Sequence, residues 1–554
     1  MWNTFETVKK KLEPEIVKAV TVKEIIKTSA KKFKDKTYLI YAPTGESLTF
    51  KEFNSLCNTL AQGLLSLPIG LEKGDRVALF LRNSPIYLAS IYACAKAGLV
   101  ETPVNWFYKE MEVKYIVGNS EAKVVICEAD LLPILLSIRK DLPNLKKIIV
   151  SGGEPQAKED KWGEVITLDE VIGMGKDKEP QVKVTQDNTM AIIYTSGTTG
   201  MPKGAVLTHK AYTLSAKAIA LWPIEEMERN YNPLPLFHIN AQIYSSLNMM
   251  LAGKTYIMGD KFSPTKFMDD VIKFEATSFN VLGSIMQVIY TACSQNPKYT
   301  KNPAKFVIVG GTPRELWEKF EETFDVQILE GYSQTEEPLP FVNHPDRDRR
   351  KIGSFGLPAF PDLEHKVKVV DENGNEVKTG TPGELIRKSP CTMKGYFRDE
   401  EKTKEAFIDG YLRTGDIVVR DEDGFTFFVD RKKFIIRRSG ENISAWEVEA
   451  VIKDHPKVED CAVIPVPDAM KGEEIKAIVK LKQGETITEE EIIFYVGKRL
   501  AHFKTPRYVE ILPNLPYTPT GRVKKAELIE EERKRENHGF DRDAMIPNWK
   551  EKLK

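Results

Sequence analysis

Residues 193–204 read I-Y-T-S-G-T-T-G-M-P-K-G and follow the apolar run M-A-I-I-Y at 190–194. Hydroxyl side chains surround Gly197, and Gly200 and Lys203 come next. Glycine lets a backbone turn its N–H groups inward because it has no Cβ, and hydroxyl and ammonium groups add hydrogen-bond donors. The stretch therefore predicts a loop, directly after an apolar run, that holds phosphate oxygens.

This loop does not match the P-loop of nucleoside triphosphatases, which reads G-x-x-x-x-G-K-[ST]. Counting from Gly197, Pro202 stands where a glycine is required, and Gly204 follows Lys203 where a hydroxyl residue is required. The sequence Y-T-S-G-T-T-G-x-P-K-G instead resembles the phosphate loop of the adenylate-forming enzymes, which include acyl-CoA synthetases, luciferases and the adenylation domains of peptide synthetases. A flexible surface loop is the alternative interpretation.

Composition excludes several other classes. A length of 554 residues indicates more than one structural unit. Lysine plus arginine and aspartate plus glutamate number 80 each, so the formal net charge is zero and no basic surface for a nucleic acid is predicted. The cysteines are scattered without a C-x-x-C pair, which argues against a zinc site or a disulfide framework. Reduced thiols are typical of the cytoplasm, where we expect the protein.

No targeting or membrane segment is expected. The N-terminus M-W-N-T-F-E-T-V-K-K-K-L mixes both signs of charge and lacks the apolar core of a secretory signal. The most apolar segment, 85–100, is shorter than the ~20 residues needed to cross a bilayer. It also contains Lys96, so a buried helix is the expected structure there.

Apolar runs of strand length alternate with helical patterns through most of the chain. The expected strands are 75–81, 122–127, 148–150, 254–258, 278–282 and 306–310, and the expected helices include 50–67 and 84–98. Such alternation predicts an α/β fold with doubly wound, parallel sheets. Residues 37–50 are expected to form a hairpin that turns at Gly45, and 151–186 to form a surface excursion.

The last third of the chain changes character. Residues 352–430 consist of short β-like runs separated by turns and predict an antiparallel β subdomain, which ends a large N-terminal domain of residues 1–430. Residues 434–554 show an α+β pattern, with a charged tail that reads as a solvated helix from Leu528 on. The resemblance implies that this small C-terminal domain is mobile, with a hinge segment at 431–433 in which Lys433 is the hinge residue.

Two further motifs extend the resemblance to the nucleotide site. G-G-T-P at 310–313 resembles the family's adenine-binding turn, and E-G-Y-S-Q-T-E at 330–336 resembles its G-Y-G-x-T-E motif. A Tyr face suits adenine, a Thr hydroxyl suits a phosphate oxygen, and a carboxylate suits Mg²⁺, which makes Glu336 the expected metal ligand. The nucleotide-binding residues implied are Thr195, Ser196, Gly197, Thr198, Thr199, Gly200, Lys203, Gly311, Thr312, Pro313, Glu330, Gly331, Tyr332, Ser333 and Thr335.

Three more residues match family positions further along the chain. Y-L-R-T-G-D at 411–416 ends in Asp416, which resembles the family's ribose-binding acid. Arg431 is implied to hold the ribose or a phosphate. Gly440, in S-G-E-N-I-S, is implied to lie near the channel for the pantetheine arm of CoA. Ordinary turn chemistry is the alternative for Asp416, and a charged surface turn for Gly440.

One stretch bears on the acyl substrate: N-P-L-P-L-F-H-I-N at 232–240. Its prolines fix an extended loop with His238 at the tip. A single histidine beside aromatic residues is often structural, but the resemblance implies that His238 gates the acyl pocket. H-I-N-A-Q resembles the carnitine and crotonobetaine CoA ligases. A medium- or long-chain fatty acid, with the amide side chains turned elsewhere, and an aryl acid are the alternatives. The substrate-binding residues implied are His238, Asn240, Gln242, Gly283 and Ile285.

The sequence departs from the family pattern at P-Y-T-P-T-G-R-V-K-K, residues 516–525, where Arg522 stands in place of the catalytic lysine. Arginine keeps the positive charge that lowers repulsion between the substrate carboxylate and the α-phosphate, although its planar group is bulkier. In an extended segment Lys524 points to the same side, so it is the alternative. The catalytic residues expected are Arg522, Lys524, Thr195, Lys203 and His238.

Taken together, the ordered motifs identify the chain as a member of the acyl-CoA synthetases. The resemblance implies that a small-molecule carboxylic acid and ATP give acyl-AMP and pyrophosphate, after which the thiol of CoA displaces AMP. ATP, Mg²⁺ and CoA are the expected cofactor set. A stand-alone adenylation enzyme that loads a carrier protein, and a non-catalytic nucleotide- or acyl-binding protein that lost its lysine, are the alternatives.

Overall fold

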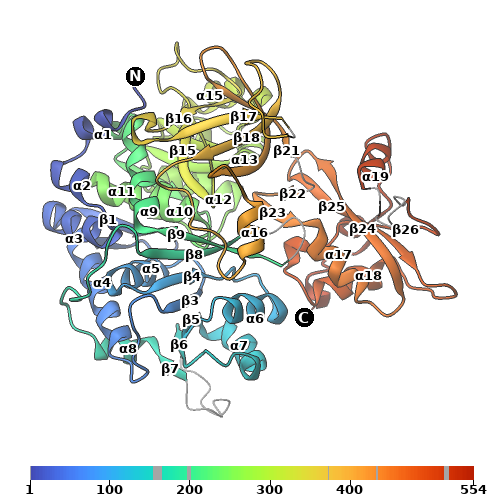
Figure 1. Ribbon diagram of the computed structural model, residues 1–554, viewed down its shortest axis with the longest axis horizontal. Coiled ribbons are helices and arrows are strands. Elements are labelled where there is room, and N and C mark those ends of the chain that lie inside the picture. The colour runs from blue at the N-terminus through green and yellow to red at the C-terminus, as the bar shows by residue number, and fades with distance from the viewer. Residues whose placement is uncertain are drawn as a thin grey trace. The chain divides into compact units, whose positions relative to one another are not determined.

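The computed structural model describes residues 2–153, 165–195, 201–371, 373–431, 435–516, 523 and 525–553. The chain divides into two compact units (Figure 1). Unit 1 contains Met1–Trp106, Ile116–Thr195 and Lys203–Asp430, and unit 2 consists mainly of Arg431–Lys554. Both units combine helices with β-sheets, so the predicted α/β class is confirmed.

The larger sheet of unit 1 has 14 strands among the described residues. The neighbours β1–β11–β10–β12–β13–β14 pair in parallel, whereas β14–β15–β16 and β17–β18–β20 pair antiparallel. The predicted antiparallel region therefore continues the parallel sheet through the β14–β15 pair. The strands are β1 (Thr37–Tyr41), β2 (Glu46–Thr49), β10 (Arg229–Asn232), β11 (Thr255–Met258), β12 (Ser278–Leu282), β13 (Phe306–Gly310), β14 (Gln327–Gln334), β15 (Glu337–Val342), β16 (Ser354–Pro358), β17 (Lys366–Val370), β18 (Gly383–Lys388), β19 (Phe407–Ile408), β20 (Tyr411–Arg420) and β21 (Thr426–Arg431).

The second sheet of unit 1 has the order β7-β6-β5-β3-β4-β8-β9 and is parallel except for the β8–β9 pair. Its strands are β3 (Arg76–Phe80), β4 (Val100–Pro103), β5 (Val124–Glu128), β6 (Lys147–Ser151), β7 (Val165–Thr167), β8 (Thr189–Thr195) and β9 (Lys203–Thr208). Strand β4 was not predicted. The expected surface excursion is also wrong in part, because it contains β7 and the helix Leu168–Met174.

Some helices of the first 430 residues begin or end at recognisable capping residues. The helix Phe50–Leu65 starts with a capping box of Thr49 and Glu52, and Pro85–Ala97 ends at Gly98 in the left-handed region, φ 70°. These helices are α1 (Phe5–Lys11), α2 (Pro14–Lys18), α3 (Val22–Phe33), α4 (Phe50–Leu65), α5 (Pro85–Ala97), α6 (Glu110–Asn119), α7 (Leu132–Ile138), α8 (Leu168–Met174), α9 (His209–Lys217), α10 (Ile239–Ala241), α11 (Asn248–Ala252), α12 (Pro264–Lys273), α13 (Gly283–Cys293), α14 (Pro297–Thr300), α15 (Arg314–Phe324) and α16 (Glu400–Glu405), with a π-helix at Gln242–Leu247.

One core cluster ties the two sheets of unit 1 together. It contains apolar residues of β3 and β5 from one sheet, of β1 and β11 from the other, and of α3, α4, α5 and α9. Helices α4 and α5 lie side by side within it, as Figure 1 shows. The burial of α5 is nearly complete, as its apolar sequence predicts, and Lys96 is buried with its ammonium paired to Glu179 at 2.8 Å.

Unit 2 has a sheet of order β23-β22-β25-β26-β27, with β24 paired to β25. Its elements are β22 (Ile435–Arg438), β23 (Glu441–Ser444), α17 (Ala445–Lys453), β24 (Val458–Asp468), β25 (Gly472–Leu481), α18 (Glu489–Gly497), β26 (Tyr508–Ile511), α19 (Lys525–Glu532), β27 (Phe540–Asp541) and α20 (Arg542–Met545).

The prediction of one solvated helix in the tail is wrong. Helix α19 ends at Glu532, and the chain then adds an edge strand to the sheet. Arg542 is buried because it donates to the carbonyl oxygen of Thr505 at 2.7 Å and stacks on Trp549 at 4.1 Å. A charged side chain can thus be buried when its hydrogen-bond donors have acceptors.

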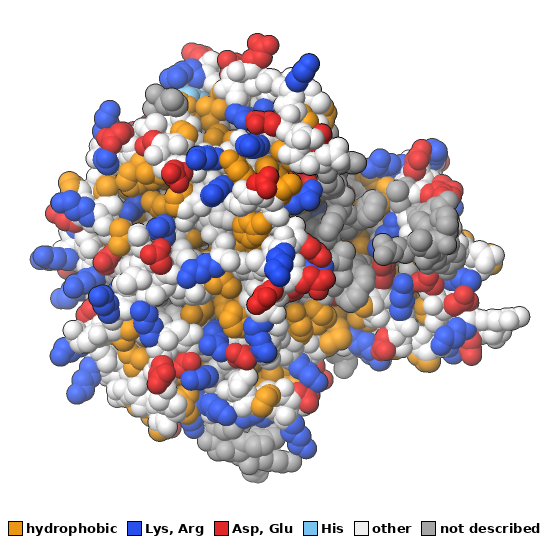
Figure 2. All heavy atoms as spheres, in the orientation of Figure 1, with side chains coloured by type: hydrophobic (Ala, Val, Ile, Leu, Met, Phe, Trp, Pro, Cys, Tyr) orange, Lys and Arg blue, Asp and Glu red, His pale blue; other side chains and the backbone are white. Residues whose placement is uncertain are grey.

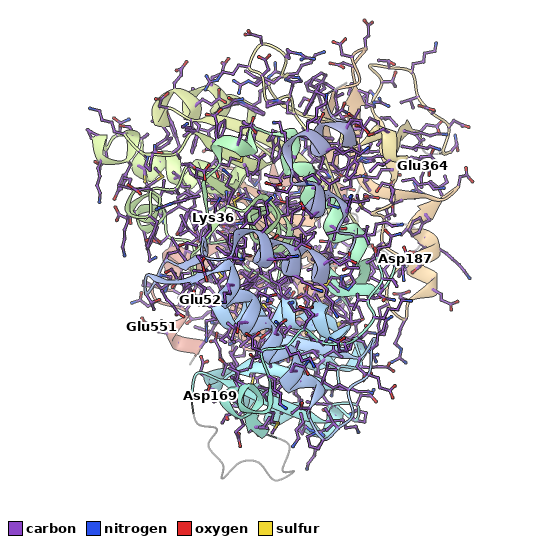
Figure 3. All side chains as sticks on the ribbon, turned by 90° about the vertical axis from the view of Figure 1, so that its left-hand side faces the viewer. Lys36, Glu52, Asp169, Asp187, Glu364 and Glu551 are labelled. Atoms are coloured by element: carbon purple, nitrogen blue, oxygen red, sulfur yellow. The ribbon has the colours of Figure 1, made fainter. Side chains whose placement is uncertain are left out.

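The visible surface agrees with the neutral composition. Figure 2 shows Lys and Arg side chains interspersed with Asp and Glu side chains, with no continuous field of one sign on the drawn face. The labelled charges Lys36, Glu52, Asp169 and Asp187 lie on the outside of unit 1 (Figure 3). None of the described helices has the length and apolar character that a membrane crossing requires.

Candidate active site

The predicted site residues of unit 1 cluster at strand ends. Strands β10, β11, β12, β13 and β14 run in the same direction, so their carboxyl ends reach one edge of the sheet. The 233–238 loop follows β10, Gly283 follows β12, and the 311–313 turn follows β13. Ligands of open α/β sheets bind at this edge, because the loops that follow parallel strands meet there.

Glu336 is the centre of a small polar group. Its Oε1 accepts hydrogen bonds from the hydroxyl of Thr195 at 3.1 Å and from the hydroxyl of Tyr396 at 3.0 Å. The ammonium of Lys203 lies 4.3 Å from the centre of the Tyr396 ring. The structure therefore brings the two ends of the predicted phosphate loop, Thr195 and Lys203, to the predicted metal ligand, and adds Tyr396, which the sequence analysis did not identify.

The second oxygen of Glu336 fits the metal role. Among the described residues, Oε2 accepts no hydrogen bond, and the side chain is partly exposed. Magnesium in phosphate-transfer sites is usually held by one or two carboxylates together with substrate phosphates. The described part of the chain holds no group of three or more His, Cys, Asp or Glu arranged for a metal. A single carboxylate that completes a nucleotide-bound Mg²⁺ is the arrangement these residues fit.

Glu330 holds the predicted adenine turn. One carboxylate oxygen accepts from the backbone N–H of Gly311 at 2.8 Å, and the other accepts from the backbone N–H of Thr312 at 3.1 Å and from its hydroxyl. Burial raises the pKa of Glu330 to about 7, while these hydrogen bonds lower it. Gly283 packs against the same turn, since a Cβ there would lie 1.9 Å from the Gly311 oxygen. Glu330 is almost fully buried, so its role is to hold the backbone of the turn in place through these hydrogen bonds.

Tyr332, Gln334 and Asp416 form a second polar group. One oxygen of Asp416 accepts from the Tyr332 hydroxyl at 2.5 Å and from the Gln334 amide at 2.8 Å. One face of the Tyr332 ring stacks on Phe355, with 4.4 Å between the centroids. Asp416 is fully buried behind these side chains. The structure thus joins Asp416 to the predicted adenine-binding Tyr, and its contact with a ribose stays a prediction.

Asn240 belongs to a cluster of amides under the 233–238 loop. Its oxygen accepts from the amide of Asn232 at 3.2 Å and from the amide of Asn280 at 3.4 Å. Asn232 and Asn280 are fully buried, whereas Asn240 is partly exposed. Because the oxygen of Asn240 faces the buried amides, its NH₂ group is the exposed end. His238, also partly exposed, is the N-cap residue of α10, and its ring packs edge-on against Phe237 with 4.6 Å between the centroids.

Gln242 points away from the surface. Its amide donates to the carbonyl oxygen of Leu236 at 2.7 Å, and its oxygen accepts from the hydroxyl of Tyr212 at 2.7 Å. Tyr212 also lies 3.1 Å from Glu101, a carboxyl on β4 that is fully buried, and burial raises the pKa of Glu101 to about 8. Both ends of the Gln242 amide are therefore engaged inside the protein.

The other predicted residues divide into two groups. Ile285 is buried in the core cluster around α12 and α13, and Gly440 forms, with Ser439, the turn of the β22–β23 hairpin at φ values of 52° and 86°. The predictions for Ser196, Gly197, Thr198, Thr199, Gly200, Lys433, Arg522 and Lys524 fall outside the described residues, as do those for the side chain of Arg431.

Comparison with known proteins shows the family of the chain. Residues 26–397 match the family of AMP-binding enzymes, and residues 447–522 match the C-terminal domain of AMP-binding enzymes. The crotonobetaine/carnitine–CoA ligase of Citrobacter koseri is 30% identical over 93% of this chain and 100% of that protein. The ligase of the same name from Salmonella arizonae is 31% identical over 90% of this chain and 96% of that protein.

Solved structures give the same architecture. A fatty acyl CoA synthetase of Mycobacterium tuberculosis is 29% identical, with a TM-score of 0.65 over 92% of this chain and 98% of that one. The anthranilate CoA ligase AuaEII is 25% identical, with a TM-score of 0.69 over 93% and 97%. The amide bond synthetase McbA of Marinactinospora thermotolerans, 21% identical, shares the fold with a TM-score of 0.80 over 92% and 99%.

Proposed function

Because the chain belongs to the AMP-binding enzyme family and is an AMP-forming acid–CoA ligase, we propose that its acid substrate is a small aliphatic carboxylic acid with a hydrogen-bond acceptor near the carboxyl group, as in carnitine. The observation that carries this proposal is the orientation of Asn240. Its oxygen is held by Asn232 and Asn280, and its partly exposed NH₂ group is a donor. A fixed donor in an acyl site favours an oxygen-bearing chain over a plain hydrocarbon.

The proposed reaction has two steps. A carboxylate oxygen of the acid attacks the α-phosphorus of ATP, the bond to the β-phosphate oxygen breaks, and pyrophosphate leaves. The thiol of CoA then loses its proton and attacks the acyl carbon, and AMP leaves with the oxygen that came from the carboxylate. Free CoA rather than a carrier protein is the proposed acceptor. Mg²⁺, when bound beside Glu336, would supply positive charge to the phosphates.

Residues of this chain would support the first step by binding charge. We propose that the hydroxyl of Thr195, which bonds to Glu336, and the ammonium of Lys203, which lies over the Tyr396 ring, hold phosphate oxygens. We further propose that Arg522, with Lys524 as the alternative, neutralises repulsion between the carboxylate and the α-phosphate. Lys433 as a hinge and Gly440 at the pantetheine channel remain proposals of the same kind.

A fatty acid is the second candidate. It is favoured by Gln242, whose amide is engaged by Leu236 and Tyr212 and adds no polar group to an acyl site. The fatty acyl CoA synthetase of Mycobacterium tuberculosis is also 29% identical. The two candidates differ in one respect, which is whether the donor of Asn240 meets an acceptor in the substrate.

Acid-dependent pyrophosphate release from Mg-ATP with CoA should separate these candidates. The panel pairs butanoate with 3-hydroxybutanoate, and adds carnitine, octanoate, palmitate and benzoate. We expect kcat/KM for 3-hydroxybutanoate to exceed that for butanoate about 5-fold, because one neutral hydrogen bond contributes about 1 kcal/mol. Asn240→Leu should abolish this preference.

The matched control is Asn188→Leu, because Asn188 is also partly exposed and only caps a turn at Thr185. This variant should keep the preference of the unaltered protein. Preference for octanoate or palmitate that Asn240→Leu leaves unchanged would contradict the proposal and support the fatty acid. Preference for benzoate would point to an aryl acid.

A further inference from the structure

The loop that carries His238 has few backbone partners of its own. Pro233 and Pro235 have no N–H group, so the loop 233–238 cannot pair as a strand. Its buried carbonyl and amide groups still need partners, because an unpaired buried polar group is costly. The structure meets this need with the side-chain amides of Asn83, Asn232 and Gln242.

Asn83 provides most of this bracing. Its amide nitrogen donates to the carbonyl oxygen of Leu234 at 2.9 Å and to that of Gly259 at 3.0 Å, and its oxygen accepts from the backbone N–H of Leu236 at 2.8 Å. The side chain is almost completely buried. Asn83 follows β3 of the second sheet, whereas the groups that it binds follow β10 and β11 of the larger sheet. One side chain therefore joins the carboxyl edges of both sheets beneath the loop.

Gln242 and Asn232 hold the same loop from other directions. Gln242 donates to the carbonyl oxygen of Leu236 at 2.7 Å, so both polar backbone groups of Leu236 are bound by side-chain amides. The oxygen of Asn232 accepts from the N–H of Leu234 at 2.8 Å. The N–H of His238 bonds to the carbonyl oxygen of Pro235 at 3.1 Å. The backbone leading to His238 is thus held by hydrogen bonds at Leu234, Leu236 and His238.

We propose that Asn83 is a positioning residue for acid binding: it fixes the backbone of the 233–238 loop, so that His238 responds to the acid by side-chain rotation while its backbone stays in place. Asn83 itself lies below the loop, bonded to backbone groups, and makes no contact with the reacting atoms in this account. The inference rests on the proposed function in one respect, namely that the loop borders the acyl group.

A residue with only a general structural role would behave differently. Loss of overall stability reduces the amount of active enzyme and leaves the KM values of both substrates unchanged. Loss of loop geometry raises the KM for the acid and leaves the KM for ATP unchanged, because the groups around Glu336 and Glu330 do not contact Asn83. The ratio of the two KM values therefore separates the two roles.

The test uses the full-length chain with Asn83→Leu, which keeps the volume and removes all three hydrogen bonds. The control is Asn58→Leu, because Asn58 is equally buried on α4 and its amide binds Asp177 at 3.1 Å, away from the loop. We expect Asn83→Leu to raise the KM for the acid at least 10-fold and to change the KM for ATP less than 2-fold. Asn58→Leu should change neither.

Hydrogen exchange gives a second readout that needs no substrate. A peptide spanning 232–238 reports few amides, because two of its residues are prolines. We expect slow deuterium uptake in the unaltered protein, unchanged by the acid, and faster uptake in Asn83→Leu. Asn83→Asp keeps the acceptor for Leu236 and regains a donor when protonated, so its KM for the acid should fall as the pH is lowered.

Equal changes in both KM values, or unaltered uptake at 232–238 in Asn83→Leu and Asn83→Asp, would overturn the inference. Uptake that slows when the acid binds to the unaltered protein would also overturn it, since the loop would then be a moving element. If the unaltered protein shows no preference for oxygen-bearing acids, the proposed substrate class fails, while the exchange result still decides the role of Asn83.

Discussion

Replacing Glu336 by glutamine should lower the rate of acid-dependent ATP–pyrophosphate exchange by about 100-fold or more, without unfolding the protein. The substitution keeps the volume and leaves an oxygen to accept from Thr195 and Tyr396, but it removes the negative charge. Loss of one preorganised electrostatic group at a reacting phosphate typically costs about 10²–10³ in rate. The Mg²⁺ concentration needed for half-maximal exchange should rise in parallel.

The control for this variant is Glu364→Gln, since Glu364 is an exposed carboxyl of unit 1 (Figure 3). It should exchange pyrophosphate at the rate of the unaltered protein. Glu336→Gln with unaltered exchange and unaltered Mg²⁺ dependence would show that Glu336 is not the metal ligand. The hydrogen bonds among Thr195, Glu336 and Tyr396 would then have a structural role only.

Glu101→Gln should make unit 1 more stable at alkaline pH. Burial raises the pKa of Glu101 to about 8, above its ordinary value of 4.5, so the native state holds a proton that the unfolded chain releases. The stability due to this proton is complete below the unfolded pKa and is lost as the pH rises through the folded pKa. Over this window the loss amounts to about 5 kcal/mol.

The hydrogen bonds agree with a protonated Glu101. The single hydroxyl hydrogen of Tyr212 bonds to Gln242 at 2.7 Å, so the 3.1 Å contact between Tyr212 and Glu101 is best made by a carboxyl that donates to the phenol oxygen. An amide at position 101 can donate in the same way. The glutamine variant therefore keeps the network and removes the titration.

Unfolding free energies of the two proteins at pH 5.0, 6.5 and 8.0 test this expectation. The difference in favour of Glu101→Gln should grow with pH, by about 1.4 kcal/mol per unit between the two pKa values. Burial raises the pKa values of the neighbouring Tyr87, Tyr92, Cys94 and Tyr212, so these groups stay neutral in this range. Glu330 is present in both the unaltered protein and Glu101→Gln, so its contribution cancels from the difference between their unfolding free energies. A difference that is constant with pH would contradict the buried, protonated state.

Much of this fold could be read from the sequence because its parallel strands are buried on both sides. The expected strands 278–282 and 306–310 coincide with β12 and β13. Strand β4 was missed because Glu101 and Pro103 interrupt its apolar pattern. All four residues of the strand are nevertheless buried. Periodicity cannot reveal a carboxyl that is buried in its neutral form.

The sequence could suggest site residues where they form a contiguous motif. Thr195, which pairs with Lys203 across β8 and β9, bonds to Glu336, and each of these residues belongs to a motif at a strand end. Tyr396 and Asn83 were missed because they reach the site from distant parts of the sequence. No local pattern marks an asparagine that bonds to the backbone of a residue 153 positions away. The directions of Asn240 and Gln242 depend on partners that only the folded chain supplies.

The acyl-adenylate route can be tested most directly with a carboxylic acid labelled with ¹⁸O in both carboxyl oxygens. The protein is incubated with this acid, Mg-ATP and CoA, and the masses of AMP, acyl-CoA and pyrophosphate are measured by mass spectrometry. The account predicts one ¹⁸O atom in AMP, one in the acyl-CoA and none in pyrophosphate. Label in phosphate or pyrophosphate, or AMP without label, would contradict the central claim that the carboxylate is activated at the α-phosphorus.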